Sequence, residues 1–262
     1  MIQSTAINAD LEALSGAPKA QSSSILAIDI GGTYIKAGVI DEAGRLLSTW
    51  ERLPTPNPAT PDAVIAIIVT LTHSLPDYRK ISIAFPGVVR DGCILTAPNL
   101  GNGEWQGFKF ADEVRRFFGR DVRILNDAVV QALGVAQGHG LQCLLTLGTG
   151  MGFALMRDSM FLAQLELGRH FACDGFCYDA YIGHAAYLAV GPISWNERVE
   201  RTVGAVRALV NFDRLYLGGG NARQIRFALP RDVTIIPMTA GITGGARLWH
   251  SDNDALFASS TP

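Results

Sequence analysis

The amino-acid sequence lacks the features that mark several classes of protein. Only 18% of its 262 residues are charged, the formal net charge is -2, and Lys and Arg are scattered, so no basic patch for nucleic acid or an acidic membrane is expected. Four cysteines do not make a disulfide framework in so long a chain, and the N-terminus has no basic segment followed by an apolar run. No apolar run approaches the roughly 20 residues of a membrane-spanning helix. We therefore expect a cytoplasmic protein that binds a small molecule, with no nucleic-acid or membrane partner.

The composition is that of a globular protein. Hydrophobic residues make up 48% of the chain, enough for one large or two modest cores. Residues 1–24 predict a disordered N-terminal tail, and residues 251–262 a C-terminal tail. Between them, apolar runs alternate with segments of helical period, which predicts an α/β protein. The runs are "SILAIDI", "KISIAFPG", "DVRILND", "LQCLLTLG", "DRLYLGGG" and "VTIIP".

Several helices have legible boundaries. Thr60, followed by Pro and Asp, predicts the cap of a helix that ends before Pro76. A second helix is predicted to open at Asp127 and to stop at Gly138. Two longer helices are predicted over residues 178–190 and 194–212.

One internal repeat suggests that the chain consists of two related halves. Residues 27–41 and 144–158 align without a gap, and each copy reads as a strand, a Gly/Thr turn and a second strand. The alignment pairs Asp29 with Thr146, Gly31 with Gly148, Ala37 with Ala154 and Asp41 with Asp158.

The turn "DIGGT", Asp29 to Thr33, favours phosphate binding. Two glycines without Cβ atoms let backbone N–H groups approach an anion, and Thr33 adds a hydroxyl. The Asp29 carboxylate would repel phosphate unless a cation such as Mg²⁺ lay between them. The alternative is an ordinary Gly-Gly hairpin turn.

The turn "TLGTG" offers the same donors in the second half. It has hydroxyls at Thr146 and Thr149 and open backbone at Gly148 and Gly150. Two such turns at matching positions would form the walls of one cleft.

The segment "ILNDA" places Asn126 and Asp127 where a strand gives way to a helix, which is typical of active-site groups in α/β folds. A carboxylate there can accept a hydroxyl proton during phosphoryl transfer. The alternative is that Asp127 only caps the helix. Weaker signals are the loops "LGGGNA", "FPGVV" and "APNLGNGEW", which also suit plain turns.

In this order, "DIGGTYIK", "FPGVV…APNL…W", "NDA", "TLGTGMG", "ELG", "LGGGNA" and "GITGGARLW" resemble the ROK family of sugar kinases, within the actin-like, sugar-kinase and Hsp70 ATPase superfamily, and most closely its polyphosphate-glucokinase-like branch. The resemblance implies two actin-like (ribonuclease H-like) α/β domains around a central cleft. We assign residues 25–127 to an N-terminal domain and 128–250 to a C-terminal domain.

The resemblance also implies roles for individual residues. Asp127 would be the base that takes the proton from the sugar hydroxyl, and Asp29 would act on Mg²⁺ through water. The sugar would be held by Gly87, Asn99, Asn126, Asp127, Glu166, Arg169 and Asp179. The phosphates and nucleoside would be held by Asp29, Gly31, Gly32, Thr33, Lys36, Thr146, Gly148, Thr149, Gly150, Gly218, Gly219, Gly220 and Asn221.

Two of the sugar-side residues depart from the family pattern. Arg169 stands where much of the family has the His of Glu-x-Gly-His, and Asp179 stands where a Glu is expected. His170, Cys173 and Cys177 with His184 supply metal-ligand types at a spacing unlike the usual zinc sites. We predict no structural zinc and leave open whether these residues bind a metal or carry free thiols.

The resemblance predicts a glucokinase-like hexokinase that uses Mg²⁺ and transfers a phosphoryl group from ATP or polyphosphate to a hexose hydroxyl. Two alternatives remain. One is a catalytically weak or inactive sugar- or nucleotide-binding homologue, and the other is a phosphohydrolase that needs no sugar. The family also implies a possible homodimer. The sequence does not choose between the two donors.

Overall fold

A computed structural model of the protein describes residues 24–101, 103–173 and 175–257. The expected N-terminal tail lies outside these residues except for Ser24. Ser24 is buried, its hydroxyl donates to the Asp77 carbonyl at 3.3 Å, and its own carbonyl accepts the Arg79 N–H at 2.9 Å. Ser24 is therefore part of the folded domain.

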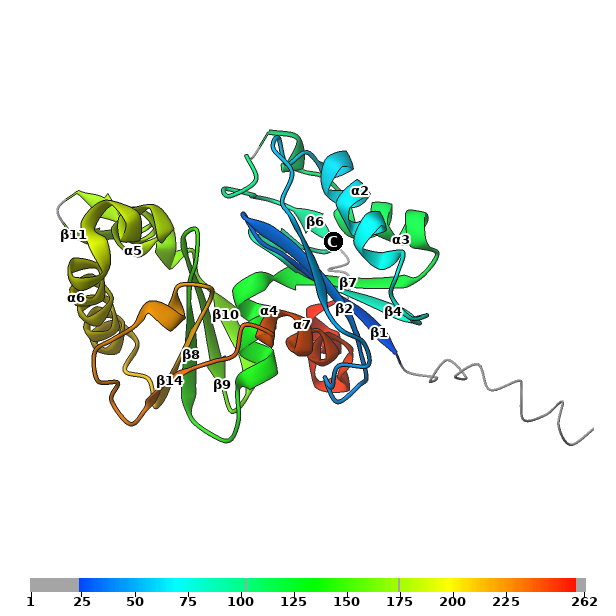
Figure 1. Ribbon diagram of the computed structural model, residues 1–262. Helices are drawn as coiled ribbons and strands as arrows, with labels where there is room; N and C mark the ends of the chain where they lie inside the picture. The colour runs from blue at the N-terminus through cyan, green and yellow to red at the C-terminus, as the bar shows by residue number, and fades with distance from the viewer. Residues whose placement is uncertain (1–23, 102, 174, 258–262) are drawn as a thin grey trace, which may run out of the picture.

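The first half of the chain forms a five-stranded sheet of order β3-β2-β1-β4-β7. Strands β1, β4 and β7 are parallel, whereas β2 is antiparallel to its neighbours β1 and β3. The helices α2 and α3 cover one face (Figure 1). The bounds are β1 Ile25–Ile30, β2 Tyr34–Ile40, β3 Glu51–Pro54, α2 Pro61–Thr72, β4 Lys80–Phe85, α3 Phe110–Phe118 and β7 Asp121–Asn126. A short hairpin of β5 Val89–Arg90 and β6 Cys93–Ile94 and the 3-10 turn η1 Gly103–Trp105 lie between β4 and α3.

The second half forms a sheet of the same design, with the order β10-β9-β8-β13-β14. The hairpin β8–β9 corresponds to β1–β2, and β13 and β14 run parallel to β8. The predicted internal repeat and the α/β class are therefore confirmed. The bounds are β8 Leu141–Leu147, β9 Met151–Arg157, β10 Met160–Gln164, η2 Leu167–Arg169, β11 Phe171–Cys173, β12 Phe176–Cys177, α5 Tyr178–Ile182, α6 His184–Val210, β13 Arg214–Gly218, η3 Ala222–Gln224 and β14 Val233–Ile235.

Local signals explain where the helices start and bend. The Thr60 hydroxyl accepts the Ala63 N–H at 3.3 Å at the start of α2, as predicted. The structure divides the region of the two predicted helices, residues 178–190 and 194–212, at other positions. The chain breaks at Gly183, and α6 then continues to Val210 through a kink at Gly191 (φ 76°) and Pro192.

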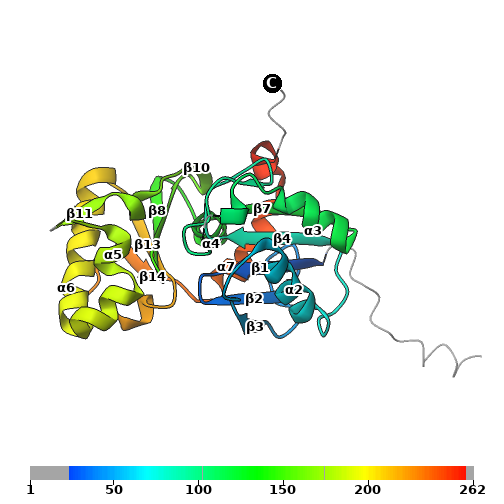
Figure 2. The ribbon, with the colours of Figure 1, turned by 90° about the horizontal axis from the view of Figure 1, so that it is seen from above.

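Helix α4, Asp127–Val135, lies between the two sheets (Figures 1 and 2). Because strand side chains alternate between faces, β1 directs Ile28 and Ile30 toward α2 and α3 and directs Asp29 the other way. In β8, Leu145 and Leu147 pack toward the α5 and α6 side. The same alternation turns Thr146, the residue paired with Asp29 in the repeat, toward the space between the sheets.

The C-terminal segment returns to the first sheet. It consists of α7 Ala240–Thr243, η4 Gly244–Trp249 and η5 Ser251–Leu256. Ile242 and Ala246 pack against Ile25, Ala27 and Ile40, so this segment covers the face of β1 opposite to α2 (Figure 1, red). We propose that residues 240–257 complete the first domain, although the sequence analysis assigned 240–250 to the second. Residues 251–257, predicted as tail, form an ordered turn, and 258–262 lie outside the described residues.

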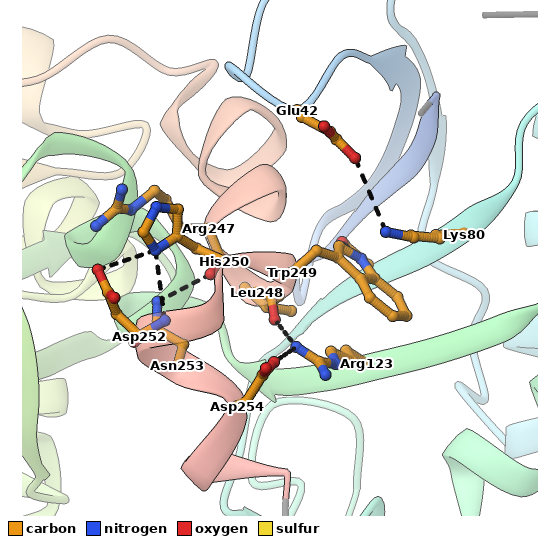
Figure 3. A network of polar contacts seen from close by, with 11 residues as sticks. Glu42, Lys80, Arg123, Arg247, Leu248, Trp249, His250, Asp252, Asn253 and Asp254 are labelled. Atoms are coloured by element: carbon orange, nitrogen blue, oxygen red, sulfur yellow. Dashed lines mark hydrogen bonds and ion pairs between the residues drawn. The ribbon is translucent and has the colours of Figure 1, made fainter. Parts of the chain in front are cut away.

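Polar contacts bind this segment to the strands below it (Figure 3). Arg123 of β7 donates to the Leu248 carbonyl at 2.6 Å and to the Asp254 carboxylate at 2.8 Å. The Trp249 ring packs under the Arg123 guanidinium at 4.6 Å and under Lys80 at 5.1 Å. The segment is therefore held by cations of the neighbouring strands β4 and β7 as well as by apolar contacts.

Within the described residues, no helix has both the length and the apolar character needed to cross a membrane.

Candidate active site

A cavity of about 400 Å³ opens between the two sheets. Its walls come from the β1–β2 and β8–β9 turns, the start of α4 and the loops that follow β4, β10 and β13. It brings together most of the residues predicted from the sequence: Asp29, Gly31, Gly32, Thr33, Lys36, Gly87, Asn99, Asn126, Asp127, Thr146, Gly148, Thr149, Gly150, Glu166, Asp179, Gly219, Gly220 and Asn221.

Two predicted residues do not line the cavity. Gly218 ends β13 and faces Gln131 and Ile236, where an added Cβ would lie 2.9 Å from the Gln131 amide oxygen. The Arg169 side chain is 63% exposed and reaches only the rear of Asp179, at 4.0 Å. The η2 turn carries this exposed side chain, and its contact with the sugar stays a prediction.

The two Gly/Thr turns meet across the cavity. The Thr33 and Thr149 hydroxyl oxygens are 3.5 Å apart, although the residues are far apart in the sequence. Each turn is closed by its own backbone, with Gly31 N–H donating to Tyr34 O at 2.9 Å and Gly148 N–H to Gly150 O at 3.0 Å. Both halves thus present hydroxyl groups and open glycine backbone at one point, which suits an anion that contacts both turns from the cavity.

Asp29 is buried in β1 beside its cross-strand neighbour on β2. The Lys36 ammonium donates to its carboxylate at 2.7 Å. The same carboxylate lies against Gly241 of α7, where an added Cβ would be 2.6 Å from an Asp29 oxygen. This close approach explains why the position has no side chain.

Asp127 is the first residue of α4, and its carboxylate lines the cavity. Burial raises the pKa of Asp127 to about 7, and the negative charges of Asp29 and Glu166 add to the rise. The Ala128 N–H, which donates to the carboxylate at 2.8 Å, and the Lys36 charge act in the opposite direction. A carboxyl that titrates near neutral pH is suited to exchanging a proton with a hydroxyl.

Asn126 performs most of the capping that the sequence left open for Asp127. Its side-chain oxygen accepts the N–H groups of Ala128 at 2.9 Å and Val129 at 3.2 Å. Its amide group donates to the Gly87 carbonyl at 3.1 Å. Asn126 therefore fixes the start of α4 against the loop after β4 and leaves the Asp127 carboxylate facing the cavity.

The second half supplies two further carboxylates. Glu166 accepts a hydrogen bond of 2.7 Å from the Gln164 amide. Asp179 accepts the Met151 N–H at 2.7 Å and lies against Gly150 and Gly168. Asp179 thus braces the β8–β9 turn while it lines the cavity.

The sequence analysis missed several lining residues, among them Tyr34, Arg52, Gln131, Arg223 and Met238. Tyr34 lies inside the motif "DIGGTYIK" but was given no role, whereas the other four lie outside the motifs quoted above. Strand pairing brings Arg52 to the cavity, the turn after β13 brings Arg223, and helix α4 brings Gln131. His184 was considered only as a metal ligand. It lines the cavity, and its Nδ1 lies 3.2 Å from the Asn221 side-chain oxygen. In the described ranges, no three His, Cys, Asp or Glu side chains gather as a metal-binding group.

Comparisons with known proteins agree with this geometry. The ROK family model matches residues 25–163. The polyphosphate glucokinase of Mycobacterium leprae (strain TN) is 31% identical over 251 residues, which span 86% of this chain and 74% of the relative. The polyphosphate glucokinase of Mycobacterium tuberculosis (strain H37Rv) is 30% identical over 245 residues, which span 84% and 88%.

Solved structures give the same picture. The inorganic polyphosphate/ATP-glucomannokinase from Arthrobacter sp. strain KM has a TM-score of 0.75 and 28% identity, covering 86% of this chain and 97% of that one. A ROK family glucokinase from Streptomyces griseus, in complex with glucose and AMPPNP, has a TM-score of 0.69 at 21% identity, covering 86% and 99%. The latter likeness concerns the two-domain, actin-like α/β fold.

Proposed function

The chain belongs to the ROK family, and from this premise we propose that it is a glucokinase-like sugar kinase, transferring a phosphoryl group to a hexose hydroxyl. The observation that carries the proposal is the position of the Asp127 carboxylate, which lines the same cavity as both Gly/Thr turns. A hydroxyl activated beside Asp127 would face a phosphate that contacts the adjacent hydroxyl groups of Thr33 and Thr149.

In the proposed reaction, the sugar hydroxyl oxygen attacks the terminal phosphorus of the donor. The hydroxyl proton passes to Asp127, and the bond from phosphorus to the rest of the donor breaks. The leaving group is ADP or a polyphosphate shortened by one unit. Asn99, Asn126, Glu166 and the Gly87 backbone would orient the sugar, so that catalysis comes mainly from positioning and charge neutralisation.

Asp29 would hold Mg²⁺ through water, and the residues present suit that ion. Mg²⁺ in kinases is bound by one or two carboxylates together with substrate phosphates and water. Asp29 supplies one carboxylate on the cavity wall. When bound, the ion would neutralise charge on the donor phosphates. Lys36, which donates to Asp29 at 2.7 Å, supplies a second positive charge at the same place.

The relatives' names guide the choice of substrates. They describe glucose and mannose kinases that use polyphosphate or ATP. We propose glucose as the first acceptor and mannose as the second, with ATP or polyphosphate as donor. We also place the protein in the cytoplasm, which cell fractionation would test.

A phosphoryl-transfer screen tests this function. It crosses ATP, GTP and polyphosphate with glucose, mannose, fructose, glucosamine and N-acetylated sugars. We expect phosphorylated hexose from the native protein and none from Asp127→Ala. Sugar-induced thermal stabilisation without any product would indicate a binding protein, and phosphate release that is independent of sugar would indicate a phosphohydrolase. Either result contradicts the proposal.

A homodimer is part of the proposal. Three large apolar side chains of the second half are strongly exposed, namely Phe171 (73%) in β11 and Leu188 (70%) and Ile193 (77%) in α6. Pairing of two copies that covers α6 would remove Leu188 and Ile193 from water. Sedimentation analysis of the native chain and of Ile193→Asp tests it, with a dimer that dissociates in the variant as the expected result.

A further inference from the structure

We propose that Arg52 and Arg223, which reach the cavity from opposite sheets, bind the phosphates of the donor that are not transferred. The inference rests on the proposed kinase function and names two residues that no sequence motif contains. Both residues line the cavity, and both are exposed.

On the first sheet, the strand register creates a row of charged side chains. Asp29 of β1 is paired with Lys36 of β2, and Lys36 is paired with Arg52 of β3. Residues directly opposite one another on neighbouring strands share a face of the sheet, and neighbouring strands are about 4.8 Å apart. Arg52 therefore stands one strand beyond Lys36 on the cavity face, farther from the reacting centre.

An aromatic ring positions the Arg52 guanidinium without neutralising its charge. Its guanidinium lies 4.7 Å from the centre of the Tyr34 ring. Across the described part of the chain, no carboxylate pairs with it, whereas Lys36 is bound to Asp29. Stacking on a ring leaves the N–H groups at the guanidinium edge available to an anion.

Arg223 occupies the facing position on the second half. It belongs to η3, directly after the loop of Gly219, Gly220 and Asn221. Its carbonyl accepts a hydrogen bond of 2.7 Å from Arg226, which fixes the turn. Among the described residues, no carboxylate forms an ion pair with Arg223 either. His184, bonded to Asn221, lies on the same wall.

Negative and positive side chains occupy different parts of the cavity. The carboxylates of Asp29 and Asp127 are buried or half-buried, whereas the guanidinium groups of Arg52 and Arg223 belong to exposed residues. Guanidinium groups bind phosphate oxygens in pairs, with charge-assisted hydrogen bonds. The ligand chemistry that matches the two arginines is therefore a condensed phosphate chain. It has two sources, the triphosphate of a nucleotide and inorganic polyphosphate.

Steady-state kinetics of Arg52→Gln and Arg223→Gln test the inference. The donors are ATP, tripolyphosphate and long-chain polyphosphate, each at saturating sugar and at several salt concentrations. Arg231→Gln is the matched control, because Arg231 is exposed and does not line the cavity. We expect each cavity variant to raise the donor KM about tenfold or more, because one charge-assisted contact is lost. The donor KM should also depend less on salt concentration. The KM for sugar should change much less.

The donor series identifies the source of the phosphate chain. A larger rise for long-chain polyphosphate than for ATP assigns the arginines to distal phosphates of polyphosphate. An equal rise in KM for all three donors shows that the arginines bind phosphates within the length of a triphosphate. A donor KM in both variants that matches Arg231→Gln for every donor overturns the inference.

Failure of the kinase function would be seen separately. If the native protein transferred no phosphoryl group, calorimetric titration with tripolyphosphate would still decide the role of the arginines. Weaker binding in both variants than in Arg231→Gln would support it, and equal binding would refute it. Arg52→Lys should recover part of the affinity, since it keeps the charge and loses the paired hydrogen bonds.

Discussion

Asp127 shows how one position is adapted to its chemistry by its neighbours. Its carboxylate starts a helix between two sheets, near the carboxylates of Asp29 and Glu166, and its pKa rises to about 7. An ordinary aspartate would be fully ionised at neutral pH but a poor proton acceptor. The raised pKa makes the carboxylate more basic without leaving it protonated throughout the physiological range.

The activity should depend on the ionisation of Asp127. Only the carboxylate can accept the hydroxyl proton, so kcat/KM for the sugar should fall about tenfold per pH unit below about 7 and level off above it. A pH series with ATP and with polyphosphate measures this and separates ionisation of the donor from that of the enzyme. A flat profile from pH 5 to 8 with both donors would remove Asp127 from the role of base.

Replacing Asp127 with Asn should reduce activity and increase stability at the same time. The unfolded carboxyl ionises near 3.8 and the folded one near 7, so the free energy of unfolding of the native chain decreases as pH rises between these values. The amide that replaces the carboxyl in Asp127→Asn does not ionise, so this cost of burying a charge is absent from the variant. Its melting temperature should exceed that of the native chain at pH 8 and approach it near pH 4, while kcat falls by about 10²- to 10⁴-fold.

The control for this experiment is Asp62→Asn, a change at an exposed position in the first turn of α2. It should leave kcat unchanged. An Asp127→Asn protein that melts below the native chain at pH 8 would show that the raised pKa has been assigned to the wrong environment.

At the residue scale, the motifs predicted which side chains gather in the cavity because glycine, threonine and carboxylate groups mark such turns in the sequence itself. Arg52 could not be found in this way. Its place depends on the register of β3 against β2, and nothing in the sequence near Arg52 specifies that pairing. The outward direction of Arg169 depends in the same way on the η2 turn.

At the scale of elements, helix α4 is packed at unusually short range against the C-terminal segment. An added Cβ on Gly134 would lie 2.6 Å from the Gly244 Cα, and one on Gly244 would collide with the Val130 carbonyl. Backbone therefore meets backbone where α4 crosses the segment, and only glycine permits it.

Gly244→Ala should separate α4 from the C-terminal segment. We expect a loss of about 1–3 kcal/mol in the free energy of unfolding from overpacking, measured by urea denaturation. Gly204→Ala on α6 is the matched control, because an added Cβ there meets nothing within 4 Å. It should be neutral or stabilise the protein by up to about 1 kcal/mol. Equal effects of the two changes would contradict the packing described.

Element boundaries were predicted best where local chemistry fixes them. The Thr60 cap and the start of α4 are both marked by their own side chains. The boundary predicted between residues 190 and 194 falls at the kink of α6, where the structure has Gly191 and Pro192. The 3-10 turns after Gly244 were missed, since short turns packed on a distant strand carry no periodic signal.

At the scale of the whole molecule, two related sheets enclose α4 and the C-terminal segment as a middle layer (Figure 2). The repeat predicted the relation between the halves, because it lies in two hairpins whose turns, residues 31–33 and 148–150, have the same length. It could not predict that residues 240–257 return to the first sheet. That return depends on apolar contacts between residues more than 200 positions apart, such as Ile242 and Ile25.

Ser82 tests this long-range closure. Its buried hydroxyl donates to the Gly245 carbonyl at 2.7 Å and accepts from the Trp249 indole at 2.9 Å. Ser82→Ala leaves both groups without that partner and should cost about 1–3 kcal/mol. Ser74→Ala, an exposed position that contacts Glu51, should stay within about 0.5 kcal/mol. Calorimetric melting of both variants measures the difference, and equal melting temperatures would refute the role of Ser82.

The return of residues 240–257 to β1 sets an order for folding on the ribosome. The strands of the first sheet are synthesised before residues 240–257, so Ile25, Ala27 and Ile40 gain their cover from residues that are made later. At about 5–20 residues per second, the intervening second half takes on the order of ten seconds to synthesise. If the first sheet forms during synthesis, we expect it to carry an uncovered apolar face throughout that interval and to bind chaperones of nascent chains.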